Sequence, residues 1–244
     1  GSYDLWTYKY EDSNIFFLKE GELYRLFGDQ ISFLSQISSS TTGEHLLTGG
    51  LDGDIFMYAK ISDQLYFSEN AGQDWEALGT LPSYTFFRNS FKSSNVNKDV
   101  ICIGGIDLYR STNGGSDWAT VNDWWEYYND PTIYRIDHSG AVIESFEANV
   151  NNMDLYQSVW VEDHDDGHLW VTAQNATFVQ LKLENGTAEI VQEFSVPYYN
   201  YGYSLTHDGK DLWFSEYYAL PDSTTIPADV SRSISSSLSL SSWI

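Results

Sequence analysis

Aromatic side chains crowd together at three places in this sequence, and acidic residues accompany them at two of the three. The stretches read DWWEYYND from Asp123, PYYNYGY from Pro197 and SEYYALP from Ser215. Flat aromatic faces beside polar groups suit stacking against sugar rings or gripping a protein loop. We therefore expect ligand contacts from these clusters, through Trp124, Trp125, Glu126, Tyr127, Tyr128, Tyr198, Tyr199 and Glu216. The alternative is that the rings seal the junctions between twisted sheets.

The carboxylates in these clusters raise the question of catalysis. Glycoside hydrolysis needs two carboxyl groups at a set separation across the scissile bond. Because the chain has 35 acidic residues, some pair always lies at a workable separation, so the carboxylates alone assign no catalytic residue. A polysaccharide-processing hydrolase or lyase is therefore the second hypothesis, behind a non-catalytic binding protein.

An acidic stretch with two histidines raises the question of a metal site. It reads EDHDDGH and holds Asp163, His164, Asp165, Asp166 and His168. A calcium loop of the EF-hand type needs oxygen ligands at alternate positions in a longer frame that ends in Glu, and that frame is absent. The two histidines could face zinc, but an acidic hairpin turn in water is the simpler account. We expect no metal and no cofactor, with Ca²⁺ as the ion left open.

The charge balance narrows the range of partners. The chain has 244 residues, with 12 lysines and arginines against 35 acidic residues and a formal net charge of −23. Such a surface repels phosphate backbones and anionic lipid, which argues against nucleic acid and membrane surfaces as partners. No apolar run is long enough to span a bilayer, so no membrane insertion is expected. The single cysteine, Cys102 in VICIGG, allows no intrachain disulfide and is expected to be a buried, unreactive thiol.

An eight-residue pattern occurs twice and sets the scale of the architecture. It reads SENAGQDW from Ser68 and STNGGSDW from Ser111, 43 residues apart. Leu-aromatic pairs recur at similar intervals, since Tyr24, Tyr66 and Tyr109 are spaced by 42 and 43 residues. A period of about 40–50 residues is that of a four-stranded propeller blade. The rhythm predicts blades at 3–40, 41–81, 82–122, 123–150 and 151–197, with a sixth beginning near Tyr198.

Local patterning supports β-strands along the chain. Apolar and polar residues alternate around each Leu-aromatic pair, as they do in half-buried strands. The pairs Ser139-Gly140, Asp166-Gly167 and Asn185-Gly186 interrupt this alternation, and Asn-Gly and Asp-Gly favour tight hairpin turns with positive φ. No stretch shows helical periodicity. The expected fold class is all-β, a β-propeller of five to seven four-stranded blades.

The repeated octapeptide resembles the Asp-box, or bacterial neuraminidase repeat, with Asn70 and Asn113 where Asp is usual. Ser and Asn side chains can bond local backbone N–H groups, Gly supplies a positive φ, and the indole covers apolar surface. The resemblance implies a structural role between the outer strands of a blade for Ser68, Asn70, Gly72, Trp75, Ser111, Asn113, Gly115 and Trp118. Families that share such boxes include sialidases, xyloglucan-processing propellers, sortilin-type receptors and a photosystem assembly factor.

Sialidase activity is disfavoured among these. The resemblance to sialidases would imply three arginines for the substrate carboxylate, a Tyr nucleophile with a Glu partner, and an acid Asp. This chain has five arginines, and none lies in the Arg-Ile-Pro setting that sialidases place near their start. Arg25 and Arg110 directly follow strand tyrosines and are expected to face solvent. A strongly acidic protein is also a poor host for an anionic sugar.

The whole chain is expected to form one propeller over residues 1–230, followed by the Ser-rich residues 231–244 as a tail or a ring-closing strand. The first hypothesis for function is an extracellular, periplasmic or cell-surface scaffold that presents an acidic, aromatic-rich face to a carbohydrate or protein. The second is the polysaccharide-processing enzyme. A third is an assembly factor for a membrane complex, which rests on the resemblance to the photosystem factor alone.

Overall fold

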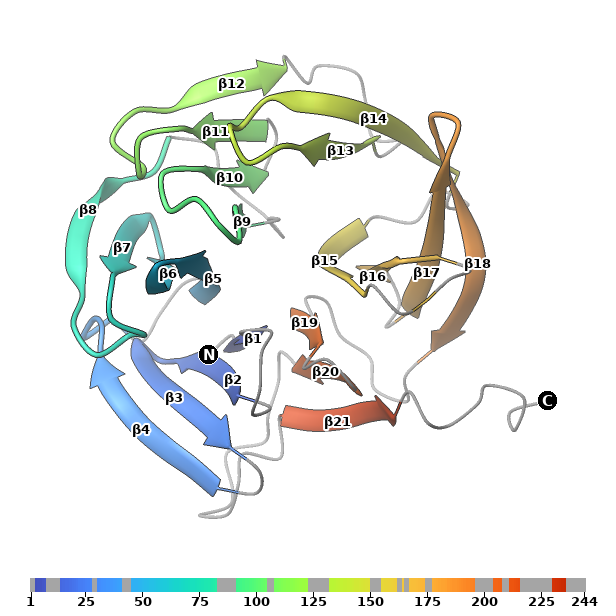
Figure 1. The fold of residues 1–244 in the computed structure, drawn as a ribbon. Coiled ribbons are helices and arrows are strands. Elements are labelled where there is room, and N and C mark those ends of the chain that lie inside the picture. The colour runs from blue at the N-terminus through green and yellow to red at the C-terminus, as the bar shows by residue number, and fades with distance from the viewer. Residues whose placement is uncertain are drawn as a thin grey trace.

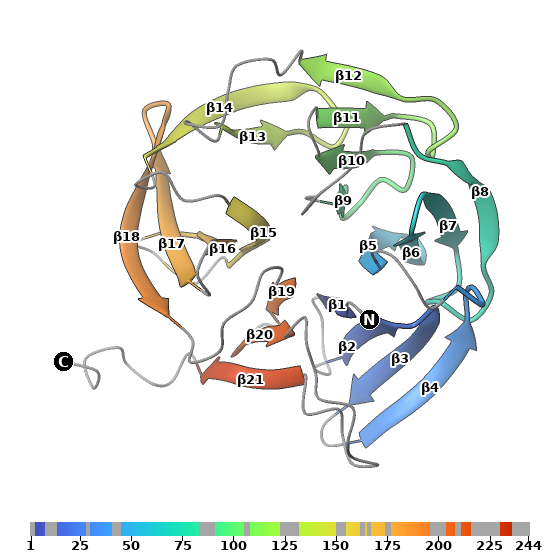
Figure 2. The same cartoon turned by 180° about the vertical axis from the view of Figure 1, so that it is seen from behind.

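The chain is an all-β propeller, and the described residues form five sheets that stand around a ring (Figure 1). Figure 2 shows the same ring from behind. The computed structural model describes residues 3–7, 14–27, 30–40, 45–82, 91–104, 108–122, 132–149, 155–161, 164, 167–173, 177–195, 204–207, 211–215 and 230–235. All the regular structure in these residues is β-strand. None of it is a helix long and apolar enough to cross a membrane.

Three sheets are antiparallel meanders of four strands that pair in sequence order. They comprise β1 (Tyr3–Thr7), β2 (Asn14–Lys19), β3 (Glu22–Phe27) and β4 (Gln30–Gln36); β5 (His45–Asp52), β6 (Asp54–Ile61), β7 (Gln64–Ser68) and β8 (Glu76–Thr80); and β9 (Phe91–Ser93), β10 (Ile101–Gly104), β11 (Leu108–Ser111) and β12 (Ala119–Asn122). In each, the first strand lies nearest the ring axis and the fourth lies at the rim (Figure 1).

The other two sheets depart from this plan. The fourth has six strands in the order β13-β14-β18-β17-β16-β15, and the fifth has three described strands in the order β19-β20-β21. Their bounds are β13 (Thr132–Ile136), β14 (Val142–Asn149), β15 (Leu155–Trp160), β16 (Leu169–Ala173), β17 (Thr177–Glu184), β18 (Thr187–Ser195), β19 (Ser204–His207), β20 (Asp211–Ser215) and β21 (Val230–Ser235). The beginning of the Ser-rich segment thus lies in β21, paired with β20, and 236–244 lie outside the described residues.

The blade expected within 123–150 is not a separate four-stranded sheet in the described residues. Strands β13 and β14 form a hairpin, and β14 pairs in parallel with β18 at the rim of the next sheet. The hairpin therefore joins the third and fourth sheets from outside the ring (Figure 1). The described residues of this segment, 132–149, hold two strands, and both belong to the six-stranded sheet rather than to a sheet of their own.

The repeated Leu-aromatic pairs occupy two kinds of strand. Tyr24, Tyr66 and Tyr109 lie in β3, β7 and β11, each the third strand of its sheet, whereas Trp170 and Trp213 lie in the second strands β16 and β20. The expected turn at Asn185-Gly186 joins β17 to β18 with φ of 53° and 79°. Both values are positive, as a two-residue hairpin turn of this type requires.

The core lies between neighbouring sheets, so central strands are buried on both faces. On β6, Met57, Ala59 and Ile61 pack against the first sheet, and Phe56 and Tyr58 pack against the third. All five side chains are at most 2% exposed. Each fully buried large apolar side chain contributes about 1.5–3 kcal/mol relative to exposure. The two-sided burial explains why β6 reads as a nearly continuous apolar run rather than an alternating one.

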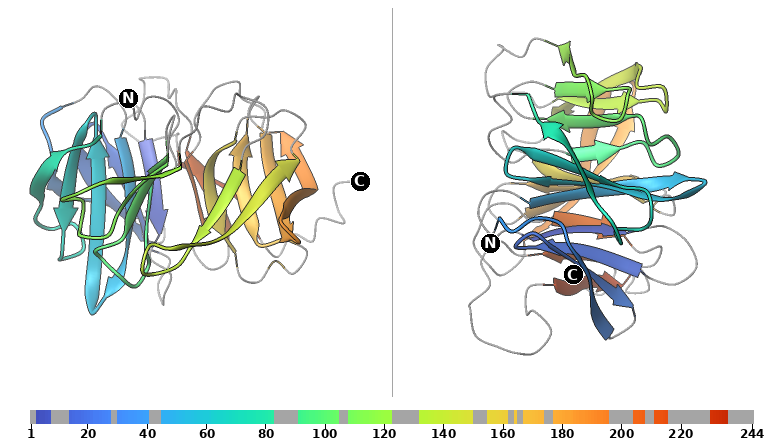
Figure 3. Two further views of the ribbon diagram at one scale, coloured as in Figure 1. Left: turned by 90° about the horizontal axis from the view of Figure 1, so that it is seen from above. Right: turned by 90° about the vertical axis from the view of Figure 1, so that its left-hand side faces the viewer.

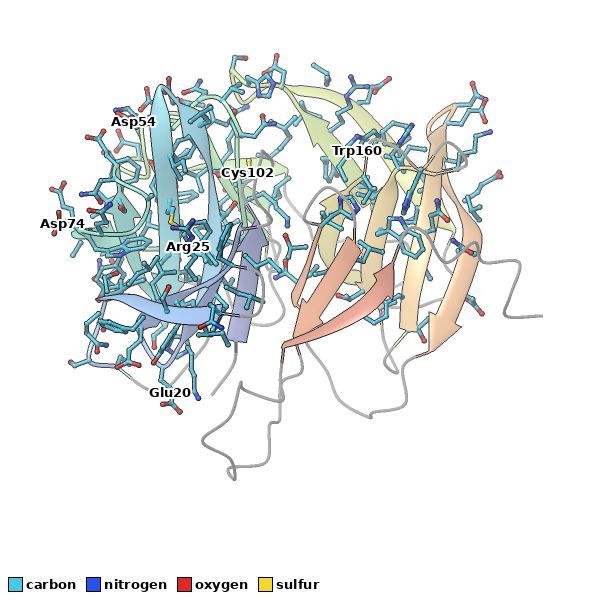
Figure 4. All side chains as sticks on the ribbon, turned by 60° about the horizontal axis from the view of Figure 1, so that its bottom comes forward. Glu20, Arg25, Asp54, Asp74, Cys102 and Trp160 are labelled. Carbon is cyan, nitrogen blue, oxygen red and sulfur yellow. The ribbon has the colours of Figure 1, made fainter. Side chains whose placement is uncertain are left out.

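The strands run from one end of the ring to the other, so the turns gather at two opposite ends (Figure 3). Figure 4 places Asp54, in the β5–β6 turn, and Trp160, at the end of β15, at the same end. Glu20, in the β2–β3 turn, lies at the opposite end.

Candidate functional site

The ligand-contact residues expected from the aromatic clusters lie outside the described residues. These are Trp124, Trp125, Glu126, Tyr127, Tyr128, Tyr198, Tyr199 and Glu216. Their role stays a prediction.

The first repeated turn, residues 68–75, is held by its own side chains. Ser68 Oγ accepts the backbone N–H of Gly72 at 2.9 Å and donates to Asn70 Oδ1 at 3.0 Å. Asn70 Oδ1 also accepts the N–H of Asp74 at 2.9 Å, and its Nδ2 donates to the Asp74 carboxylate at 2.9 Å. The indole N–H of Trp75 closes the turn on Gly72 O at 3.0 Å.

The second repeated turn, residues 111–118, has the same hydrogen bonds at matching positions. Ser111 Oγ accepts from Gly115 N at 2.8 Å, and Asn113 receives the N–H of Asp117 at 2.9 Å. The indole N–H of Trp118 donates to Gly115 O at 3.1 Å. Both turns join the third and fourth strands of a sheet. The matching geometry follows from the matching sequence, because nearly every bond is local.

Each repeated turn is pressed against the preceding sheet. A Cβ on Gly72 would lie 2.2 Å from Leu23 Cδ2 of the first sheet, and one on Gly115 would lie 2.6 Å from Leu65 Cδ2 of the second. The indoles of Trp75 and Trp118 pack against the two apolar clusters at those junctions. In the first turn, Trp75 Nε1 also donates to Ser35 Oγ on β4 at 3.1 Å. Gly72, Gly115 and the two indoles therefore lie at the contacts between neighbouring sheets.

Five turns at the Asp54 end are tied into one surface, which we call the turn face: residues 52–54, 69–75, 94–99, 112–118 and 137–141. The 94–99 loop links the other four. The backbone N–H of Leu51, just before the first turn, donates to Asn95 O at 2.8 Å, and that of Gly114 donates to Asp99 O at 2.9 Å. Lys98 pairs with Glu69, and Asn97 Nδ2 donates to His138 O at 2.7 Å. The turn face is therefore preorganised over two sheets and the β13–β14 hairpin.

The turn face is strongly acidic. Lys98 is its only lysine or arginine, against seven acidic residues: Asp52, Asp54, Glu69, Asp74, Asp99, Asp117 and Asp137. Six of the seven are exposed, and Asp137 is partly buried. Carboxylates gathered on one face of a protein create a negative potential that attracts cations and basic partners and repels acidic ones.

Hydrogen bonds on the turn face stabilise the ionised forms of Lys98 and Asp137. Hydrogen bonding to Glu69 raises the pKa of Lys98. The Ser139 hydroxyl and the backbone N–H groups of Ser139 and Ala141 lower the pKa of Asp137. A general acid in glycoside hydrolysis needs a carboxyl pKa raised toward neutrality. The Asp137 shift has the opposite direction, so this carboxylate suits turn capping and electrostatics rather than proton donation.

Arg110 is not the solvent-facing residue that the sequence predicts. It is partly buried, and its Nη1 donates to Gly140 O at the tip of the β13–β14 hairpin. Its Nε is buried and has no hydrogen-bond partner among the described residues. Arg25 is also partly buried, with its guanidinium 5.6 Å from the centre of the Phe27 ring. The alternation of apolar and polar residues predicts that both side chains point outward. The β13–β14 hairpin covers Arg110, and the Phe27 ring covers part of Arg25.

The histidines of the acidic stretch are used in packing. His164 Nδ1 accepts the indole N–H of Trp170 at 2.6 Å, and His168 Nδ1 lies 3.0 Å from Val161 O. The Asp163, Asp165 and Asp166 side chains lie outside the described residues. In the part of the chain that the structure describes, no three His, Cys, Asp or Glu side chains are grouped to hold a metal ion.

Sequence reasoning missed several members of this site. Asp74 and Asp117 precede the two tryptophans in both octapeptides, a repetition that could have identified them. Lys98 and His138 had no such signal, because their contacts join segments that are distant in the sequence. Trp160, which is 50% exposed, stands in an alternating strand pattern that marks it no differently from a packed residue.

Comparison with known proteins bears on the fold. No protein-family model and no curated protein matches the chain. Among solved structures, the chain is similar to YCF48 bound to D1 peptide, at 10% identity over 88% of this chain and 75% of that one, TM-score 0.49. It is also similar to Kluyvelomyces marxianus Hsv2 (14% identity, 84% and 73% covered, TM-score 0.42) and the Niastella koreensis GH74 enzyme (17%, 92% and 30%, 0.36). At such identities the likeness says nothing of ligand or activity.

Proposed function

We propose that this propeller is a non-catalytic binding scaffold whose turn face receives a protein partner with a basic surface, in an extracellular, periplasmic or cell-surface setting. The observation that supports it is the concentration of seven carboxylates against one lysine on five turns that hydrogen bonds tie together. A rigid acidic surface favours a basic partner by charge complementarity and speeds its association.

A protein partner fits this surface better than a carbohydrate does. Neutral sugars gain little from a field of carboxylates, and acidic polysaccharides are repelled by it. A lysine- or arginine-rich surface gains from every carboxylate that it approaches, and the gain falls as salt screens the charges. The polysaccharide-processing enzyme has no support from the described carboxylates, because the two with resolved pKa shifts, Asp137 and Glu184, are both shifted downward.

The test compares two charge-neutralised variants. Asp54→Asn with Asp99→Asn removes two carboxylates from the turn face, and Glu20→Gln with Asp63→Asn removes two from turns at the opposite end. The probes are nona-arginine and nona-glutamate peptides, measured by calorimetry at low salt and at about 0.15 M salt. We expect nona-arginine alone to bind, with affinity about three- to tenfold weaker for the turn-face variant and nearly unchanged for the control.

Two results would contradict the proposal. One is equal weakening by both variants, which would mean that the peptide senses net charge rather than the turn face. The other is binding of a neutral oligosaccharide without binding of the basic peptide, which would return the carbohydrate hypothesis to first place.

A further inference from the structure

Trp160 is a large apolar side chain left half in solvent at the inner edge of the fourth sheet. It is the last residue of β15, the innermost strand of that sheet (Figure 1), and is 50% exposed. Trp170, on the adjacent strand β16, is 1% exposed and packs in the junction with the fifth sheet. Packing between sheets therefore accounts for the second indole but leaves the first unexplained.

The Trp160 ring is supported from within the chain by a stacked neighbour. The His168 imidazole stacks on it with ring centres 4.8 Å apart and an interplanar angle of 27°. His168 is itself held by Nδ1 at 3.0 Å from Val161 O, and its carbonyl accepts the Val161 N–H at 2.8 Å. Holding an aromatic ring in place in advance reduces the ordering entropy that binding would otherwise lose.

We infer that Trp160 receives an arginine side chain of the basic partner, an inference that rests on the proposed function. Trp160 lies at the same end of the ring as Asp54 (Figure 4), so a partner drawn to the turn face approaches the end of the ring that carries this indole. The face of an indole attracts cations through its quadrupole, and a planar guanidinium can also stack on it. Arginine is enriched at protein interfaces and lysine is depleted, which favours arginine as the occupant.

The acidic surroundings separate arginine from a sugar ring as the occupant. Both can stack on an exposed indole. Only the guanidinium also gains from the carboxylates of the turn face, so its binding must weaken with salt, whereas stacking of a neutral sugar is nearly insensitive to salt. The acidic residues therefore favour an arginine side chain over a neutral sugar at Trp160.

The experiment measures binding of hexa-arginine, hexa-lysine and cellohexaose to the whole chain and three variants. Trp160→Ala removes the ring, Trp160→Phe retains a smaller one, and Phe33→Ala removes another exposed aromatic side chain, 55% exposed on β4. Thermal unfolding establishes that each variant is folded. We expect Trp160→Ala to weaken hexa-arginine binding about three- to thirtyfold and hexa-lysine binding less. Trp160→Phe should fall between, and Phe33→Ala should bind like the unaltered chain.

The outcomes distinguish the two proposals. If the unaltered chain binds neither basic peptide, the proposed function is overturned. If it binds both but Trp160→Ala binds hexa-arginine with unchanged affinity, the assignment of Trp160 alone is overturned. Binding of cellohexaose that is lost in Trp160→Ala would make the indole a sugar platform and would also overturn the assignment.

Discussion

Gly72 meets two separate demands, and the sequence reveals only one of them. Its φ of 79° suits glycine, and the Ser-x-Asn-x-Gly spacing predicts such a turn. The second demand is space, because a Cβ there would lie 2.2 Å from Leu23 Cδ2 and 3.1 Å from Met57 Sδ. Those atoms come from other strands, so no local pattern could predict the contact.

Two alanine substitutions separate these demands. Gly53 has almost the same φ, 78°, and nothing within 4 Å of an added Cβ. Gly53→Ala should therefore lower the free energy of unfolding by about 1–2 kcal/mol through backbone strain alone. Gly72→Ala should lower it by about 2–5 kcal/mol, since overpacking adds to the strain. Urea unfolding measures both, and equal losses would show that the turn is not pressed against the first sheet.

Cys102 illustrates how far burial can be predicted from an apolar run. The VICIGG pattern predicts a buried thiol, and the residue is in fact partly buried on β10. Desolvation is the main cause that raises the pKa of its thiol to about 11. The thiolate is the reactive form, so little of it exists at neutral pH.

We expect Cys102 to react with a water-soluble disulfide reagent at least about tenfold more slowly at pH 8 in the folded chain than in denaturant. The rate should rise with pH up to about 11 in the folded chain, because the raised pKa moves thiolate formation upward. Cys102→Ser gives the reagent blank. A folded rate equal to the denatured rate would mean that the thiol lies open to solvent.

The β13–β14 hairpin is the element that the sequence predicts least well. Its turn at Ser139-Gly140 is local and was predicted, and Gly140 has a φ of 85°. The segments that the hairpin contacts were not predicted. The parallel contact pairs Glu147–Asn149 with Thr187–Glu189, and the tip packs on Arg110 and Thr112 of the third sheet. Such long-range pairings leave no periodic pattern in the sequence, so periodicity alone assigns the hairpin to a separate blade.

The Asp137 carboxylate accepts the hydrogen bonds that hold the tip of the hairpin. Its substitution should alter the hydrogen-exchange protection of the hairpin and the dependence of that protection on pH. Its Oδ1 accepts from Ser139 N, Ser139 Oγ and Ala141 N at 2.9, 2.6 and 2.9 Å. Since its pKa is lowered in the folded state, its contribution is present above the ordinary aspartate pKa of about 3.9 and is lost as pH falls through the lower folded value.

Hydrogen exchange over 132–149 measures this effect as a function of pH. Asp137→Ala should lose protection at all pH values, because the acceptor is gone. Asp137→Asn retains a neutral acceptor, so it should keep much of the protection. It should not show the further loss of protection that the unaltered chain shows below about pH 4. Protection in Asp137→Ala that matches the unaltered chain would contradict the role assigned to this side chain.

At the scale of the whole molecule, periodicity predicted the fold class and the four-stranded plan of the first three sheets. It could not predict which groups share an end of the ring, because that depends on five turns meeting through bonds such as Gly114 N to Asp99 O. The net charge argued against nucleic acid and anionic lipid as partners, but it did not predict where the acidic residues gather. The structure adds a place for that charge, the turn face, which lies opposite the Glu20 end (Figure 4).

Hydrogen exchange of the whole chain, with and without saturating nona-arginine at low salt, tests the central claim most directly. We expect new protection in the five turns of the turn face, residues 52–54, 69–75, 94–99, 112–118 and 137–141. We expect no change in the turns at 20–21 and 62–63 of the opposite end. Protection at the opposite end, or spread evenly around the ring, would contradict the claim that the turn face is the binding surface of this propeller.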